Sequence, residues 1–220
     1  MIKYAIFDMD GTLFDTEEMF CRSWLETSER YGLENALRVY EGVAGASADT
    51  AKKILRESYK DRVDPDSFFA ERTQLTVEIF EREGIPVKPG CLELLEFLKS
   101  REIPMAVGTS TPMYITEKNL KSAGVYDYFC DIVTSEMVKN GKPSPDIFLE
   151  AGKRIGAVPS ETIVCEDSTN GLRAAYAAGM KPVFIFDRQM PDAETLSHVY
   201  ARCETLGGVI DVIKKENNIK

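Results

Sequence analysis

The sequence contains almost no histidine, which limits the metal chemistry available to it. The single histidine, His198, cannot complete a zinc cluster with the five cysteines, because no two cysteines have C-x-x-C spacing. An odd number of cysteines also argues against a disulfide framework and indicates reduced thiols. These features predict a protein of the cytoplasm.

Long apolar runs are absent as well. No run reaches the roughly 18 residues of a membrane span, and the apolar stretch before Asp8 is too short for the core of a signal peptide. We therefore expect a cytoplasmic protein with no membrane partner.

The sequence has fewer basic than acidic residues. The 27 lysines and arginines against 36 acidic residues give a net charge of −9, so the long-range field repels nucleic acids and anionic membranes. A nucleic acid polymer is thus excluded as a partner, and we expect a monomer or weak oligomer that binds a small molecule. A phosphate site in this chain would need its own local positive potential, from a metal, a lysine or backbone N–H groups.

Short apolar runs separated by helix-like segments predict a parallel sheet. The runs cover residues 2–7, 103–108, 130–134, 162–165 and 182–186. Strands that alternate with helices favour an α/β fold with a Rossmann-like parallel sheet and helices on both faces. Such a sheet binds ligands beyond the carboxyl ends of its strands.

One stretch, residues 15–84, shows helical periodicity and no convincing strand. Asp15 and Glu18 fit a capping box for a first helix that ends at Gly32, and further helices are expected at 48–59 and 66–83. We predict a small all-helical cap domain at 15–85, inserted after the first strand of a core formed by 1–14 and 86–220.

Acidic and other polar residues follow the predicted strands. Asp8 and Asp10 stand two residues apart after the first run, and Gly11 allows a tight turn. One acid can attack a substrate while its neighbour moves protons. A turn rich in Asp and Gly, favoured by local hydrogen bonds, is the alternative. Polar residues at the other strand ends favour a ligand site; they are Thr109, Ser110, Lys142, Glu166 and Asp167.

With these motifs in this order, the sequence resembles the haloacid dehalogenase-like hydrolase superfamily, in the capped branch of phosphatases and β-phosphoglucomutases. The resemblance covers essentially the whole chain and implies a phosphoric monoester hydrolase. By this resemblance Asp8 is the nucleophile that forms an aspartyl phosphate, and Asp10 protonates the leaving group and then deprotonates water. Thr109, with the backbone of Ser110, would hold the phosphoryl oxygens, and Lys142 would bridge Asp8 and phosphate.

Phosphoryl transfer spreads negative charge over oxygens and needs cations in place before the reaction. Asp8, Glu166, Asp167 and the backbone carbonyl of Asp10 form the oxygen-rich set that Mg²⁺ prefers, so Mg²⁺ is the expected cofactor. Glu166 and Asp167 also precede a predicted helix, whose N-terminus attracts acids. Both explanations can hold together.

Rival functions differ at single positions. Dehalogenases of the superfamily lack the second aspartate, so Asp10 favours phosphoryl chemistry. A sugar phosphomutase is the main alternative, but Phe20 and Ala48 stand where β-phosphoglucomutases carry a histidine and an arginine. Lys52 could partly replace that arginine. A receiver-like regulatory domain, phosphorylated on Asp8, would be shorter and would lack the helical insertion.

Substrate specificity is expected from the insertion, through Thr16, Glu17, Phe20 and Ser47. Phe20 and Trp24 are four residues apart on one helical face, so both could instead belong to the core of the insertion. If Phe20 faces the cleft, it favours an apolar or ring-bearing leaving group. Sugar and nucleotide monophosphates both remain candidate substrates.

Overall fold

The computed structural model describes residues 1–44, 46 and 48–219. The chain divides into two compact units. Residues Met1–Asp15 and Pro86–Lys220 form one, here called the sheet unit, and Thr16–Ile85 form the other, the helical unit.

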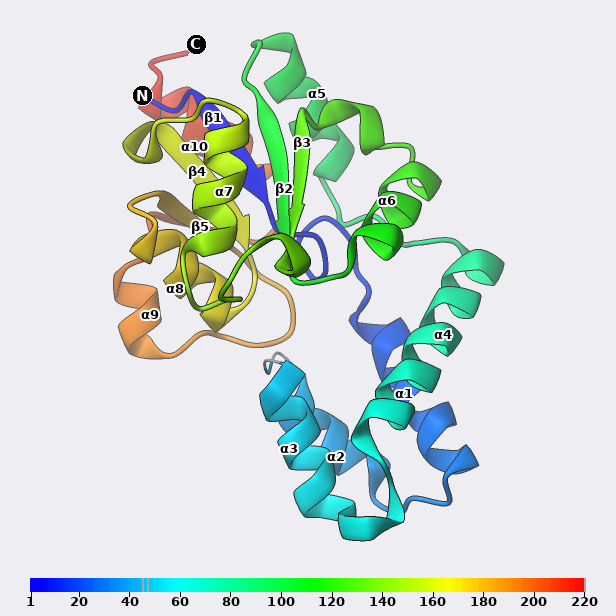
Figure 1. Ribbon diagram of the computed structural model, residues 1–220. Coiled ribbons are helices and arrows are strands. Elements are labelled where there is room, and N and C mark those ends of the chain that lie inside the picture. Colours follow the sequence, from blue (N-terminus) through cyan, green and yellow to red (C-terminus); the bar gives the residue numbers. More distant parts are fainter. Residues whose placement is uncertain (45, 47, 220) are drawn as a thin grey trace. The chain divides into compact units, whose positions relative to one another are not determined.

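A parallel sheet of six strands, in the order β3-β2-β1-β4-β5-β6, is the centre of the sheet unit (Figure 1). The strands are β1 (Tyr4–Phe7), β2 (Met105–Thr109), β3 (Asp131–Thr134), β4 (Thr162–Glu166), β5 (Lys181–Ile185) and β6 (Ala201–Cys203). Phe7 at the end of β1 pairs with Val107 of β2 and Cys165 of β4. The parallel register therefore brings the carboxyl ends of three strands to one edge. The predicted Rossmann-like sheet is confirmed.

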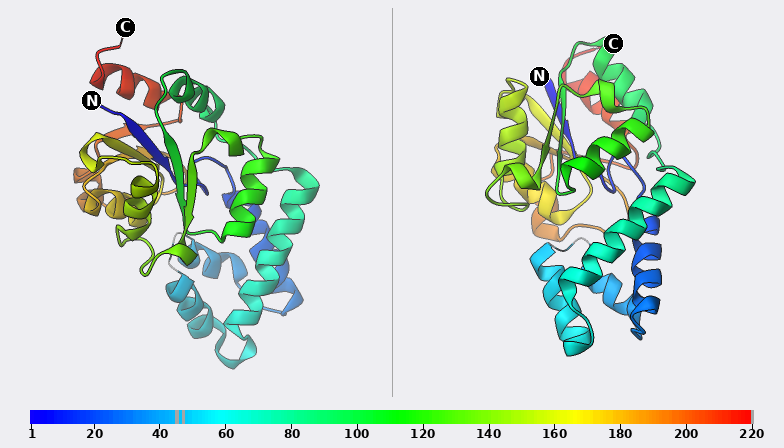
Figure 2. Two further views of the ribbon diagram at one scale, coloured as in Figure 1. Left: turned by 45° about the horizontal axis from the view of Figure 1, so that its top comes forward. Right: turned by 45° about the vertical axis from the view of Figure 1, so that its right-hand side comes forward.

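Helices cover both faces of this sheet (Figure 2). They are α5 (Cys91–Ser100), α6 (Met113–Ser122), α7 (Asp146–Arg154), α8 (Thr169–Ala177), α9 (Ala193–Ser197) and α10 (Gly208–Glu216), with short 3-10 turns at Tyr126–Tyr128, Ser135–Met137 and Pro159–Glu161. The helices α7 and α8 pack on one face, where Phe148 and Ala174 bury against Ile6 and Val164. On the other face α10 lies against α5. Strands buried on both faces read as continuous apolar runs, which is why the sequence reveals them.

The described part of the helical unit contains only helical elements, namely α1 (Glu17–Arg30), α2 (Ala36–Val43), α3 (Ala48–Tyr59), the 3-10 turn η1 (Lys60–Arg62) and α4 (Pro65–Glu83). Its core surrounds the fully buried Trp24, whose ring lies 4.8 Å from that of Phe68 and 5.8 Å from that of Tyr40. The indole N–H donates to the carbonyl of Ala36 at 2.9 Å. Trp24 is therefore a core residue of this unit. No helix among the described residues is long and apolar enough to cross a membrane.

Three details of the sequence-based prediction were wrong or incomplete. The first helix begins at Glu17 with Thr16, not Asp15, as its N-cap residue. The N–H of Asp15 donates to the carbonyl of Pro86 at 2.9 Å. The helix α2 was not predicted, and it extends to Val43. The three-residue strand β6 was also missed, because a strand so short leaves no apolar run.

Paired linkers join the two units. Besides the bond from Asp15 to Pro86, the N–H of Lys88 donates to the carbonyl of Leu13 at 2.9 Å. The Lys88 ammonium also forms an ion pair of 2.7 Å with Asp187, just after β5, and both side chains are largely buried. Both linkers are thus fastened to each other and to the sheet unit.

The segment just before the central strand is bound to the end of the last helix. The side-chain carbonyl of Asn217, which caps α10, accepts from the N–H of Ile2 at 2.6 Å, and its amide donates to the carbonyl of Ile2 at 2.8 Å. A primary amide thereby satisfies both backbone groups of one residue.

We expect Asn217→Ala to lower the free energy of unfolding by about 1–3 kcal/mol, because two partly buried hydrogen bonds are lost and Ile2 keeps unpaired groups. Urea denaturation measures the change. Lys215→Ala, at an exposed position of the same helix, is the control and should change stability by less than about 0.5 kcal/mol. Equal effects of the two substitutions would contradict a role for Asn217.

Candidate active site

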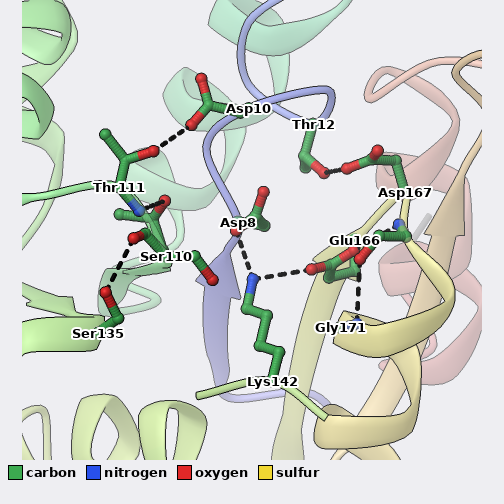
Figure 3. A network of polar contacts seen from close by, with 12 residues as sticks. Asp8, Asp10, Thr12, Ser110, Thr111, Ser135, Lys142, Glu166, Asp167 and Gly171 are labelled. Carbon is green, nitrogen blue, oxygen red and sulfur yellow. Dashed lines mark hydrogen bonds and ion pairs between the residues drawn. The ribbon is translucent and has the colours of Figure 1, made fainter. Parts of the chain in front are cut away.

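The predicted site residues of the sheet unit come together at the carboxyl edge of the sheet (Figure 3). Asp8 follows β1, Thr109 is the last residue of β2 and Glu166 is the last residue of β4. Lys142 reaches the same place from the segment that precedes α7. Residues from four distant parts of the sequence thus meet at one point.

Lys142 lies between two carboxylates. Its ammonium donates to Asp8 and, at 2.8 Å, to Oε1 of Glu166, and its side chain is only 7% exposed. Burial lowers the pKa of Lys142, but the charges of Asp8 and Glu166 raise it by more, so the pKa lies above the ordinary lysine value. The ammonium therefore stays charged and supplies local positive potential beside Asp8.

The acidic residues of the site repel one another. Burial raises the pKa of Asp8 to about 7; Lys142 opposes this rise, and the charges of Glu166 and Asp10 add to it. Burial also raises the pKa of Asp167 well above its ordinary value, with further contributions from Glu166 and Asp8. More carboxylates gather here than one lysine neutralises, which favours a further cation.

Asp10 is turned toward the end of β2 (Figure 3). Its Oδ2 accepts from the hydroxyl of Thr111 at 2.6 Å, and the N–H of Thr111 donates to the hydroxyl oxygen of Thr109 at 3.1 Å. Thr111 thereby connects two predicted motifs. Sequence reasoning missed Thr111, although the run of hydroxyl residues after the strand was a usable signal.

Ser110 takes part through its backbone. Its carbonyl accepts from the hydroxyl of Ser135 at 2.8 Å, while its own side chain is exposed. Ser135 begins the 3-10 turn after β3 and was not predicted as a site residue. The bond joins the loop that follows β2 to the turn that follows β3.

The turn after Asp8 is shaped around Asp167. The buried hydroxyl of Thr12 donates to Oδ1 of Asp167 at 2.8 Å. Gly11 has φ +79°, and a Cβ at this position would lie 2.4 Å from Oδ2 of Asp167. Glycine is required here both by the left-handed backbone and by the close approach of the carboxylate. Thr12 lies inside the predicted motif but was not assigned a role.

The donor set fits a hard divalent cation, although it is not a closed cage. Among the described residues, no three acidic, histidine or cysteine side chains converge as a ligand group. Both oxygens of Glu166 are engaged, because Oε1 accepts from Lys142 at 2.8 Å and Oε2 accepts from the N–H of Ser168 at 2.6 Å. Asp8 and Asp167 carry carboxylates whose pKa values are raised. Mg²⁺ commonly uses one or two carboxylates and keeps several waters, so these two residues suit it.

The predicted specificity residues belong to the helical unit. Thr16 is the buried N-cap residue of α1, and the carboxylate of Glu17 accepts from the hydroxyl of Tyr40 at 2.6 Å. The guanidinium of Arg72 lies 4.9 Å from the ring centre of Phe20. Ser47 lies outside the described residues.

The sequence does not reveal how the basic side chains of the helical unit are paired. Lys52 was considered as a replacement for the arginine that β-phosphoglucomutases carry. Its ammonium forms an ion pair of 2.5 Å with Asp66. Arg72 was missed, because a lone arginine within a long amphipathic helix gives no signal of its position. The guanidinium of Arg72 lies over one face of the Phe20 ring, which is a cation–π contact.

Comparison with known proteins identifies the family of the chain. Residues 5–185 match the family of haloacid dehalogenase-like hydrolases. The phosphorylated carbohydrates phosphatase of Thermotoga maritima is 32% identical over 195 residues, which cover 89% of this chain and 90% of that protein. The fructose-1-phosphate phosphatase YqaB of Escherichia coli (strain K12) is 34% identical, with coverage of 82% and 96%.

A solved structure, that of CbbY from Rhodobacter sphaeroides in complex with phosphate, has a TM-score of 0.80 at 26% identity and covers 95% of this chain and 96% of its own. The prediction of a phosphoric monoester hydrolase agrees with the phosphatase relatives. From the match over most of its length and from these relatives, the chain belongs to the haloacid dehalogenase-like hydrolase family.

Proposed function

We propose that this protein is a Mg²⁺-dependent phosphatase that hydrolyses a small phosphomonoester through an aspartyl phosphate on Asp8. The observation that carries the proposal is the buried ammonium of Lys142, bound to Asp8 and Glu166 in a chain of net charge −9. It provides part of the local positive potential that a phosphate site in such a chain needs, and a bound cation would provide the rest. The names of the relatives make sugar monophosphates the first substrates to test.

In the first step, an oxygen of Asp8 attacks phosphorus and the bond from phosphorus to the leaving oxygen breaks. Asp10 gives its proton to that oxygen. In the second step Asp10 takes a proton from water, and the hydroxide oxygen attacks the aspartyl phosphate to release inorganic phosphate and restore Asp8. Lys142, Thr109 and the backbone of Ser110 bind the phosphoryl oxygens and hold them in position.

Asp8, Asp167 and the backbone carbonyl of Asp10 would hold Mg²⁺. The bound ion would neutralise negative charge on the phosphoryl group and on the carboxylates around it. We propose further that the helical unit is the cap that provides specificity, with Glu17 and Phe20 among the contributing residues.

The mechanism predicts that Asp8→Asn abolishes turnover and leaves the fold intact, because the amide keeps the shape but lacks the nucleophilic charge. Asp10→Asn should lower turnover by about 10²–10⁴-fold, the usual contribution of general acid–base catalysis. Rates on a sugar monophosphate and the circular dichroism spectrum test this. An Asp8→Asn protein that keeps more than a few per cent of the activity would exclude the covalent mechanism.

Asp167→Asn should abolish stabilisation by Mg²⁺ and should stabilise the metal-free protein. At 100 times its dissociation constant, Mg²⁺ would add about 2.7 kcal/mol to the free energy of unfolding of the unmodified protein. Without metal, removing a charge that Asp8 and Glu166 repel should raise that free energy by about 0.5–2 kcal/mol. Urea denaturation with Mg²⁺ and with a chelator measures both effects.

Asp127→Asn, at an exposed position of the sheet unit, is the control and should respond to Mg²⁺ as the unmodified protein does. Glu166→Ala should lose less Mg²⁺ affinity than Asp167→Asn, because both oxygens of Glu166 already accept hydrogen bonds, from Lys142 and from the N–H of Ser168. If Mg²⁺ stabilised Asp167→Asn as much as the control, Asp167 would not be a ligand.

Hydrolysis should exceed mutase activity. A mutase must protect its aspartyl phosphate while the sugar bisphosphate reorients, and Phe20 can neither donate a hydrogen bond nor carry charge. We expect inorganic phosphate from fructose 1-phosphate, or from another sugar or nucleoside monophosphate of a panel, to form faster than glucose 6-phosphate from β-glucose 1-phosphate with catalytic glucose 1,6-bisphosphate. The reverse order would make the protein a phosphomutase.

A further inference from the structure

Glu166 is held by the first turn of α8. Its side chain is 1% exposed, and its Oε2 accepts from the N–H of Ser168, the N-cap residue, at 2.6 Å. The hydroxyl oxygen of Ser168 accepts in turn from the N–H of Gly171 at 3.0 Å. A carboxylate in this place is favoured by the positive end of the helix dipole. Its other oxygen, Oε1, accepts from Lys142.

Gly171, in the first turn of α8, lies beside Glu166 (Figure 3). A Cβ at Gly171 would be 1.6 Å from Oε1 and 1.9 Å from Cδ of Glu166, and the three closest heavy atoms to it all belong to that side chain. Glycine is not needed for the backbone, because Gly171 is not among the residues of positive φ. Alanine is otherwise the better residue inside a helix. The glycine is therefore explained by the room it leaves for Glu166.

We propose that Gly171 is a positioning residue of the reaction, which lets Glu166 lie against α8 and so fixes the ammonium of Lys142 beside Asp8. The role in catalysis rests on the proposed function. If Glu166 were displaced, Lys142 would keep Asp8 as a partner but lose the second carboxylate that orients it. The ammonium would then no longer be held where phosphate must bind.

The experiment is a double-mutant cycle of Gly171→Ala and Glu166→Ala, with the two single variants and the combined one. Three quantities are measured: kcat/KM on the best sugar monophosphate, the Mg²⁺ dissociation constant by calorimetry and the urea midpoint of unfolding. Gly208→Ala is the control, because it too lies in the first turn of a helix of the sheet unit and its Cβ would meet Cys203 at an ordinary 3.4 Å.

In the presence of Glu166, Gly171→Ala should lower kcat/KM by about 10–100-fold, the value of a charge-assisted hydrogen bond. It should lower the urea midpoint and change the Mg²⁺ dissociation constant by less than about threefold, since the acids proposed as ligands are elsewhere. In the Glu166→Ala background, the same substitution should leave kcat/KM within about twofold and should not lower the urea midpoint. Gly208→Ala should change none of these quantities appreciably.

An equal loss with and without Glu166, or no loss at all, would overturn the proposal. Should Gly171→Ala alone fail to fold, a folded double variant would support the contact and an unfolded one would overturn it. The urea midpoints decide this contact even if the protein shows no phosphatase activity. Inactivity of the unmodified protein on the panel would contradict the proposed function instead.

Discussion

The arrangement of the site depends on keeping one ammonium charged at a buried position. Lys142 is held there by two carboxylates, and neither of them could lie at this place in ionised form without a cation. Removing Lys142 would leave two buried carboxylates without their cation, and removing either carboxylate would take one of the two partners from the ammonium. Asp8 and Glu166 come from the adjacent strands β1 and β4, while Lys142 arrives from the segment before α7.

The sheet makes this arrangement possible because the ends of neighbouring parallel strands lie together even when the strands are far apart in the sequence. Asp8 and Glu166 are far apart in sequence, yet β1 and β4 are direct neighbours in parallel register. The backbone then refines the positions of the side chains. Gly11 allows Asp167 to approach the turn after β1, and Gly171 allows Glu166 to approach α8. In both places the absence of a side chain determines where a carboxylate lies.

Much of this could be predicted from the sequence, for a physical reason. Buried parallel strands form continuous apolar runs, so the residues that follow them, such as Asp8 and Asp167, stand out as polar. Less visible were Thr12 and Thr111, which act through hydrogen bonds to acids that lie far away along the chain. Their partners depend on strand order and register, which local patterns do not encode.

Local sequence patterns also did not reveal where the first helix begins or which side chains meet in the helical unit. Asp15 fits a helix cap by local spacing, but its N–H is used in pairing the two linkers. Arg72 has no distinguishing neighbours in the sequence, and only the packing of α4 on α1 places it over Phe20. Tertiary contacts decided both positions.

The burial of Lys142 has a consequence for the effect of salt on binding. Dissolved ions screen charges that face solvent, with a range of about 8 Å at physiological ionic strength, and they reach an ammonium that is 7% exposed only weakly. The net charge of −9, in contrast, acts on an anionic ligand from the surface. Added salt therefore weakens the repulsion by the negative surface charge more than the attraction by the buried Lys142. A phosphorylated ligand should associate faster as ionic strength rises. Proteins that attract phosphate with exposed lysines show the opposite dependence.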